Sequence, residues 1–251
     1  MIRINHLSGG YGQEEILHNL QVEFYEGKVN VIIGPNGCGK SSLLKSIIGL
    51  MPRQQGEIFL GEENLNSQSP RERAKKIAYL PQNKTSSDIT VFQMVLHGRF
   101  PYLNYPRRYG EKDRKIARAA MVSMGIEDVA EKKVSQLSGG TIQKVYLAMI
   151  LAQETSVILM DEPTANLDIR HQKRVMEEAK ILAARGKTVI MVLHDLTQVF
   201  TIADRIIVMQ EGAIKKYGTT EEIYESAIIE EVFGISMGRI WIQEEWKYYY
   251  L

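Results

Sequence analysis

The stretch that decides the fold is a glycine-rich turn at residues 34–41, which reads Gly34-Pro35-Asn36-Gly37-Cys38-Gly39-Lys40-Ser41. It follows a β-branched run at residues 29–33 and precedes a segment of helical character over residues 40–48. Glycine at the first and sixth positions, followed by Lys and Ser, fits the phosphate-loop pattern in the strand–turn–helix context that this pattern requires. The turn therefore predicts a phosphate-binding loop.

The chemistry of such a loop assigns a role to most of its positions. Glycines let the backbone wrap a phosphate so that its N–H groups point inward, and the following helix aims its positive end at the same place. Lys40 is expected to reach the β- and γ-phosphates, and the Ser41 hydroxyl to ligate Mg²⁺. The predicted ATP-binding residues of the loop are Gly34, Pro35, Asn36, Gly37, Cys38, Gly39, Lys40, Ser41 and Ser42.

An apolar run at residues 156–160 ends in Asp161 and Glu162. Two acids at the carboxyl end of a buried strand lie where α/β sheets bind their ligands. Asp161 is expected to hold Mg²⁺, and Glu162 to act as general base on the attacking water. The alternative is that both acids only cap the next turn.

Hydrophobic patterning indicates how the chain is organised. Strand patterns at residues 157–160, 188–193 and 205–210 alternate with helical patterns at 169–184 and 196–202. Such alternation predicts a parallel sheet covered on both faces. Residues 2–7 and 20–24 alternate like half-buried strands, and Leu7-Ser8-Gly9-Gly10 between them is interpreted as a turn. From Thr90 onward the pattern is helical at residues 111–124 and 142–152, with a loop rich in Pro, Tyr and Arg at residues 100–110.

Composition excludes several classes of function. The 251 residues carry 31 Lys plus Arg against 30 Asp plus Glu, so a formal charge of +1 gives no electrostatic reason to bind nucleic acid. Cys38 is the single cysteine, which rules out an intrachain disulfide. No stretch approaches the ~18 apolar residues of a membrane span, and the N-terminus lacks a signal-peptide core.

A third motif, Leu137-Ser138-Gly139-Gly140, precedes a helix. Ser can cap that helix, and the glycines leave its first amides open to an anion; alone it is an ordinary helix start. This motif, the phosphate loop and the acidic strand together resemble the ATP-binding-cassette (ABC) family over nearly the whole chain. Gln82, Ala165-Asn166-Leu167-Asp168 and His194 add to the resemblance.

The resemblance implies an α/β phosphate-loop NTPase: a RecA-like parallel core sheet, an N-terminal antiparallel β subdomain and an α-helical signature subdomain. It also implies one ABC ATPase domain over residues 1–251, with a catalytic lobe at 1–82 and 156–251 and the helical subdomain at 83–155.

The same resemblance implies a homodimer. Two chains would pack head to tail, so that the phosphate loop of one and Ser138, Gly139, Gly140 and Asp168 of the other enclose each ATP; Asp168 has the alternative role of capping its own helix. Tyr11 would stack on adenine, Gln82 would touch Mg²⁺ or water, and His194 would bond the γ-phosphate and hold Glu162. Thr141 and Lys144 depart from the family pattern, which has Gln or Glu and commonly Arg there. We expect ATP clamping to survive both changes.

Cys38 has two interpretations. The adjacent helix start would lower its pKa and make it reactive, or it is a small buried filler.

Residues 90–102 and 218–235 are similar to the ATPases of iron-siderophore, haem and cobalamin importers. The implied partners are a transmembrane permease dimer, near the loop with Tyr102, Tyr105, Arg107 and Arg108, and indirectly an extracellular substrate-binding protein. The chain would then be peripheral on the cytoplasmic face of the membrane. The alternatives are the ATPase of a zinc or manganese importer and a soluble ABC ATPase without a permease. A DNA-processing ATPase is disfavoured because the chain lacks a coiled-coil insertion and a basic face.

Overall fold

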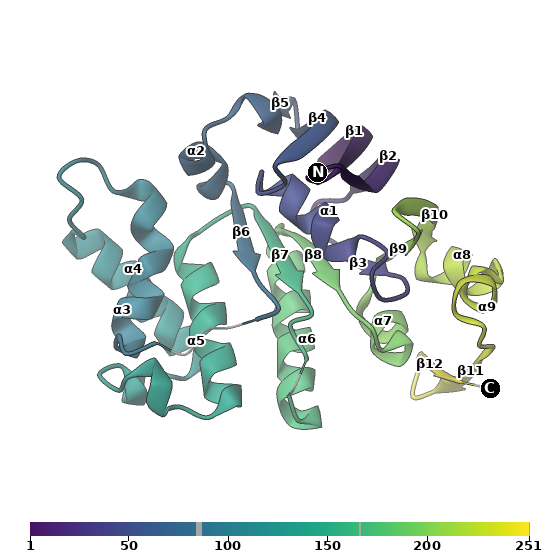
Figure 1. The fold of residues 1–251 in the computed structure, drawn as a ribbon. Coiled ribbons are helices and arrows are strands. Elements are labelled where there is room, and N and C mark those ends of the chain that lie inside the picture. The colour runs from purple at the N-terminus through teal and green to yellow at the C-terminus, as the bar shows by residue number, and fades with distance from the viewer. Residues whose placement is uncertain (84–86, 166, 251) are drawn as a thin grey trace.

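The computed structural model describes residues 1–83, 87–165 and 167–250. Its centre is a six-stranded sheet in the order β10-β9-β3-β8-β7-β6 (Figure 1). All neighbouring strands run parallel except β10, which pairs antiparallel with β9. The strands are β3 (Val29–Ile33), β6 (Ile77–Leu80), β7 (Val157–Asp161), β8 (Thr188–Val192), β9 (Arg205–Gln210) and β10 (Ala213–Thr219). The predicted parallel α/β core is confirmed.

The central strands are mostly apolar because both faces of the sheet are covered; the buried polar residue inside β3, Asn30, has its side chain hydrogen-bonded to backbone groups. In β3, Val31 and Ile33 point into one hydrophobic cluster and Ile32 points into the other. Side chains alternate along a strand, so a strand buried on both faces is a nearly continuous hydrophobic run. The glycine-rich turn follows the carboxyl end of β3, and the two acids lie at the carboxyl end of β7. The parallel sheet therefore brings both motifs to the same edge.

A four-stranded antiparallel sheet, ordered β2-β1-β4-β5, covers one side of the core. Its strands are β1 (Ile2–Tyr11), β2 (Glu14–Phe24), β4 (Arg53–Leu60) and β5 (Glu63–Asn64). The predicted turn at residues 7–10 is wrong, because these residues continue β1. They pair with β2 on one side and β4 on the other, and register shifts accommodate the two glycines. The helices on this side are α1 (Lys40–Ile47), a short 3₁₀ helix at Leu65–Ser67 and α2 (Pro70–Ala74).

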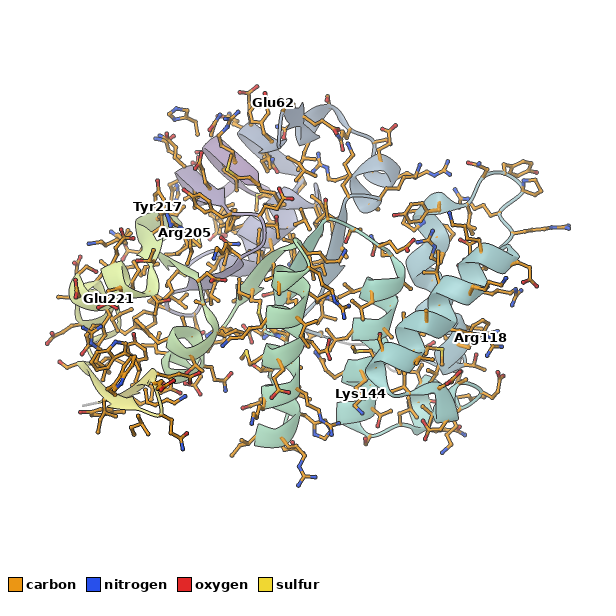
Figure 2. All side chains as sticks on the ribbon, turned by 180° about the vertical axis from the view of Figure 1, so that it is seen from behind. Glu62, Arg118, Lys144, Arg205, Tyr217 and Glu221 are labelled. Carbon is orange, nitrogen blue, oxygen red and sulfur yellow. The ribbon has the colours of Figure 1, made fainter. Side chains whose placement is uncertain are left out.

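The middle of the chain forms a group of helices at the far end of the central sheet (Figure 1). Thr90 caps α3 by accepting from the Gln93 backbone N–H, and the Gln93 side chain completes a capping box by accepting from the Thr90 backbone N–H. The α-helices are α3 (Val91–Leu96), α4 (Glu111–Met124) and α5 (Gly139–Ala152); 3₁₀ helices lie at His97–Tyr102, Glu127–Val129 and Val134–Gln136. Figure 2 shows Arg118 and Lys144 on this helical part, whereas Arg205, Tyr217 and Glu221 lie on the opposite side of the molecule and Glu62 lies on the antiparallel sheet.

The rest of the chain packs on the central sheet. Its helices are α6 (Ile169–Ala184), α7 (Leu196–Ile202), α8 (Thr220–Glu225) and α9 (Ile228–Phe233), followed by a hairpin of β11 (Met237–Ile242) and β12 (Glu245–Tyr250). The Tyr248 ring lies 4.8 Å from Phe200 of α7, and the Tyr250 hydroxyl donates to Asp195 Oδ1 at 3.1 Å. The described part of the tyrosine-rich tail therefore packs on its own fold. Within the described ranges, no helix combines the length and apolarity that crossing a bilayer requires.

Candidate nucleotide site

The glycine-rich turn occupies the connection between β3 and α1, and two of its glycines are required by geometry. A Cβ on Gly34 would lie 2.1 Å from the Met209 carbonyl oxygen of the neighbouring strand β9. Gly39 has φ +100°, a conformation that L side chains rarely adopt, and its Cβ would lie 2.9 Å from Leu17. The loop can therefore wrap this tightly only with glycine at these positions.

Lys40 folds back into the loop that precedes it. Its ammonium donates to the carbonyl oxygens of Gly34 and Pro35, each at 2.8 Å, and the residue is only 5% exposed. This places a positive charge at the centre of the loop.

Cys38 is also buried, with its Sγ 3.9 Å from the Lys40 Nζ. Burial raises the pKa of the thiol, and the nearby Lys40 charge only partly offsets this effect. A raised pKa leaves less of the reactive thiolate. The reactive-thiol interpretation is wrong in this structure, and Cys38 acts as a small buried filler.

Asp161 lies directly beside the loop, at the end of β7. Its Oδ1 accepts a hydrogen bond from the Ser41 hydroxyl at 2.9 Å, and its Oδ2 accepts one from the Tyr79 hydroxyl at 3.2 Å. Asp161 is 2% exposed, and burial raises the pKa of its carboxyl, partly opposed by these two hydrogen bonds. Sequence reasoning missed Tyr79, which reaches Asp161 from the neighbouring strand β6; burial raises the pKa of its hydroxyl, so it remains a donor.

Glu162 is held between the two other predicted catalytic residues. Its Oε2 accepts from Gln82 Nε2 at 2.5 Å, and its Oε1 lies 2.5 Å from His194 Nε2. The Glu162 backbone has φ +46°, which is rare for a residue with a side chain and typical of functional turns. The structure thus brings Gln82, Glu162 and His194 together from three loops at the carboxyl edge of the sheet.

These groups open onto one cavity of 740 Å³. Its lining residues are Ile16, Asn36, Gly37, Gly39, Lys40, Ser41, Ser42, Gln82, Glu162 and His194. Ile16 is an apolar wall that the sequence did not indicate. Tyr11 is not among the described residues lining this cavity; it lies at the end of β1 and is 37% exposed.

The residues predicted to act on a second chain's nucleotide lie elsewhere. Ser138 caps α5, accepting from the Thr141 amide at 3.4 Å, and its hydroxyl also pairs with the Thr141 hydroxyl at 2.9 Å. Asp168 caps α6 through the His171 amide at 2.9 Å. Among the described residues, neither Ser138, Gly139, Gly140 nor Asp168 lines the 740 Å³ cavity. Asn166, also in the motif before α6, lies outside the described residues.

In the segment at residues 98–102, Arg99 and Tyr102 hold the helical part of the fold together. Arg99 is buried and donates to the Ala152 carbonyl and Glu154 at 2.8 Å each and to Asp113 at 3.2 Å, while its guanidinium stacks 4.0 Å from the Tyr102 ring. Tyr102 itself donates to the Gln153 carbonyl at 2.7 Å. Of the loop expected at an interface, Tyr105 is 97% exposed, whereas Tyr102 is half-buried.

Fold and site together define a phosphate-loop nucleotide hydrolase with a glutamate at the mouth of its loop. The ABC transporter family model matches residues 17–165. The chain is 39% identical to the ferric enterobactin transport ATP-binding protein FepC of Escherichia coli (strain K12), over 93% of this chain and 87% of that protein. It is 40% identical to the achromobactin transport ATP-binding protein CbrD of Dickeya dadantii (strain 3937), over 91% and 86%. It is 36% identical to the hemin import ATP-binding protein HmuV of Thermobifida fusca (strain YX), over 91% and 80%.

Solved structures agree with this assignment. An ABC transporter described as of metal-chelate type, in an inward-facing conformation, superimposes with a TM-score of 0.85 at 27% identity, covering 100% of this chain and 96% of that one. A nucleotide-free ATP-binding cassette gives 0.84 at 24% identity, covering 93% and 97%, and supports the fold. The chain belongs to the ABC transporter family, as an ATP-binding subunit that hydrolyses ATP.

Proposed function

We propose that this chain energises the import of an iron chelate, haem or cobalamin through a permease dimer. One observation carries the proposal: relatives named for siderophore and hemin transport align with about nine-tenths of this chain. The structural neighbour described as of metal-chelate type supports the same class of cargo.

Within the site, the loop amides and Lys40 bind the triphosphate, because they place positive charge around a space that only glycine backbone leaves open. Tyr11 stacks on the adenine. Ser41 and Asp161 would hold Mg²⁺, since their oxygens already lie 2.9 Å apart and hard oxygen ligands suit this ion. When bound, Mg²⁺ neutralises charge on the phosphates.

Glu162 takes a proton from the attacking water as general base, and Gln82 and His194 orient its carboxylate. The two hydrogen bonds to Glu162 support these roles, because each fixes one carboxylate oxygen. Gln82 also contacts the Mg²⁺ site, and His194 bonds the γ-phosphate.

A second copy of the chain completes the site. Among the described residues, Ser138, Gly139, Gly140 and Asp168 do not line their own chain's 740 Å³ cavity, which supports a role on the partner's nucleotide. The start of α5 provides backbone amides for the γ-phosphate, as helix starts do for anions.

The helical subdomain at residues 83–155 joins the catalytic lobe at 1–82 and 156–251 as two parts of one ATPase domain. Exposed Tyr105, Arg107 and Arg108 suit the contact with the permease, since aromatic and Arg side chains are enriched at interfaces. The chain then works at the cytoplasmic face of the membrane, and an extracellular binding protein delivers the cargo to the permease.

Reconstitution tests this function. The complete transporter in liposomes should hydrolyse ATP and accumulate a labelled ferric chelate, haem or cobalamin, and Glu162→Gln should slow both activities severely. Accumulation of free Zn²⁺ or Mn²⁺ instead, or purification of an active chain with no membrane partner, would contradict the proposal.

A further inference from the structure

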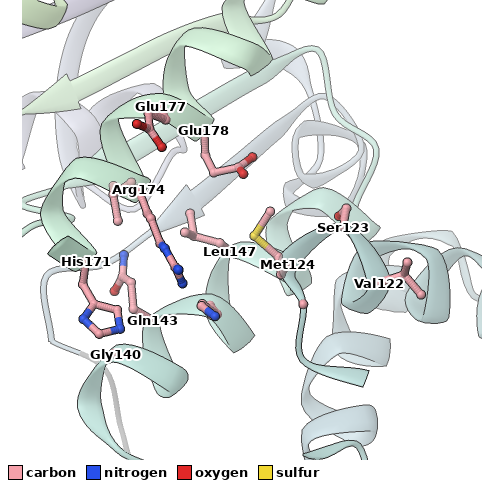
Figure 3. Close-up of a pocket in the computed structure, with 13 residues that line it drawn as sticks. Val122, Ser123, Met124, Gly140, Gln143, Leu147, His171, Arg174, Glu177 and Glu178 are labelled. Carbon is pink, nitrogen blue, oxygen red and sulfur yellow. The ribbon is translucent and has the colours of Figure 1, made fainter. Parts of the chain in front are cut away.

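The starts of α5 and α6 meet at one close contact. A Cβ built on Gly140 would lie 2.5 Å from Nε2, 2.6 Å from Cδ2 and 2.8 Å from Cε1 of His171. The imidazole therefore packs against the Gly140 backbone, as Figure 3 shows. Any side chain at position 140 would have to displace this ring.

The other side of the same ring is bound to Asp168. The His171 Nδ1 lies 2.8 Å from Asp168 Oδ1, and the same oxygen caps α6 by accepting from the His171 amide at 2.9 Å. An ionised carboxylate accepts only, so Nδ1 carries the proton in this pair. These two bonds fix the orientation of the ring that Gly140 contacts.

Gly140 and His171 also line a cavity of 410 Å³ between α5, α6 and the end of α4. Met124, Gln143, Leu147, Arg174 and Glu178 are among the residues that line it (Figure 3). The buried Gln143 amide has no hydrogen-bond partner within the described ranges. Packing between α5 and α6 is thus incomplete beside the Gly140–His171 contact, which increases the share of this contact in holding the two helix starts at their distance.

We propose that His171 is a positioning residue that fixes the Ser138–Gly140 segment relative to Asp168. The inference rests on the proposed function, in which both segments act on the nucleotide of a second copy. Two surfaces of one chain can engage the same bound ATP only when their spacing is correct, and a displacement of about 1 Å can cost on the order of 10²-fold. His171 links the two by packing on Gly140 and bonding Asp168.

The test measures ATP-driven dimerisation in the Glu162→Gln background by analytical ultracentrifugation. Adding His171→Ala should weaken the dimer at least about tenfold, equivalent to about 1.4 kcal/mol, while calorimetry shows unchanged ATP binding and thermal unfolding is unchanged. His171→Asn keeps an amide near Asp168 but is too short to reach Gly140, so it should behave like His171→Ala. His171→Gln reaches as far as Nε2 and should restore part of the affinity.

Lys173→Ala, an exposed position on the same helix, is the matched control and should leave dimerisation unaltered. In the wild-type background, His171→Ala should make the ATPase rate per chain rise with protein concentration, because dimer formation becomes limiting. Equal dimer affinity with and without His171→Ala would overturn the positioning role alone. If Glu162→Gln itself stays monomeric with Mg-ATP, the shared site fails and the inference fails with it.

Discussion

Replacing Glu162 by Gln separates the chemistry of this residue from its geometry. The carboxylate receives one hydrogen bond from Gln82 at 2.5 Å and one contact from His194 Nε2 at 2.5 Å. A glutamine side chain has the same shape, and its oxygen can still accept from Gln82. Its amide can donate to His194 Nε2 when the imidazole proton is on Nδ1. The site should therefore keep its arrangement while losing the carboxylate that we propose takes the proton from water.

The expected loss follows from the size of general-base catalysis. A positioned base contributes about 10²–10⁴-fold, which is about 3–5 kcal/mol of barrier at about 1.4 kcal/mol per tenfold. Single-turnover hydrolysis of labelled ATP should slow by this factor, and calorimetric ATP affinity should stay within about threefold of the wild-type value. Glu57→Gln, a carboxylate on the antiparallel sheet, should hydrolyse normally. A Glu162→Gln chain that turns over at the wild-type rate would remove Glu162 from the base role.

Three further perturbations follow from buried contacts. Lys40→Ala should lose Mg-ATP affinity, since it removes the charge that lies inside the loop, and calorimetry showing unchanged binding would contradict that role. Burial raises the pKa of Cys38, so iodoacetamide should label it more slowly at pH 8 than it labels a free thiol, and labelling should accelerate at higher pH as thiolate forms. Mg-ATP should protect Cys38 from iodoacetamide, and equal labelling with and without Mg-ATP would refute the proposal that the nucleotide covers this residue. Arg99→Leu should destabilise the chain by about 2–4 kcal/mol in urea unfolding, because it removes the buried cation that donates to Asp113 and to the Ala152 carbonyl, and a loss below about 1 kcal/mol would contradict this account.

Much of the nucleotide site was predictable because local sequence fixes it. The glycine pattern at residues 34–41 requires a particular backbone, and Asp161 and Glu162 follow an unmistakably buried strand. Helix ends were equally clear where a capping residue and a glycine mark them, as Asp168 and Gly186 do for α6.

The remaining features depend on partners distant in sequence. The two glycines at residues 9–10 read as a turn, but pairing with β2 and β4 keeps them in a strand. The β11–β12 hairpin is local but was missed for another reason: its turn residues, Gln243 and Glu244, adopt the positive φ that Asn or Gly usually supplies, so the sequence carries no turn signal there. The bond from Tyr79 to Asp161 and the contact between His171 and Gly140 were likewise visible only once the elements were packed together.

The most direct test is the structure of the Glu162→Gln chain with Mg-ATP. Our account predicts two copies, with each triphosphate held by Lys40 of one and facing Ser138 of the other. A single copy that encloses the triphosphate with its own residues would contradict it.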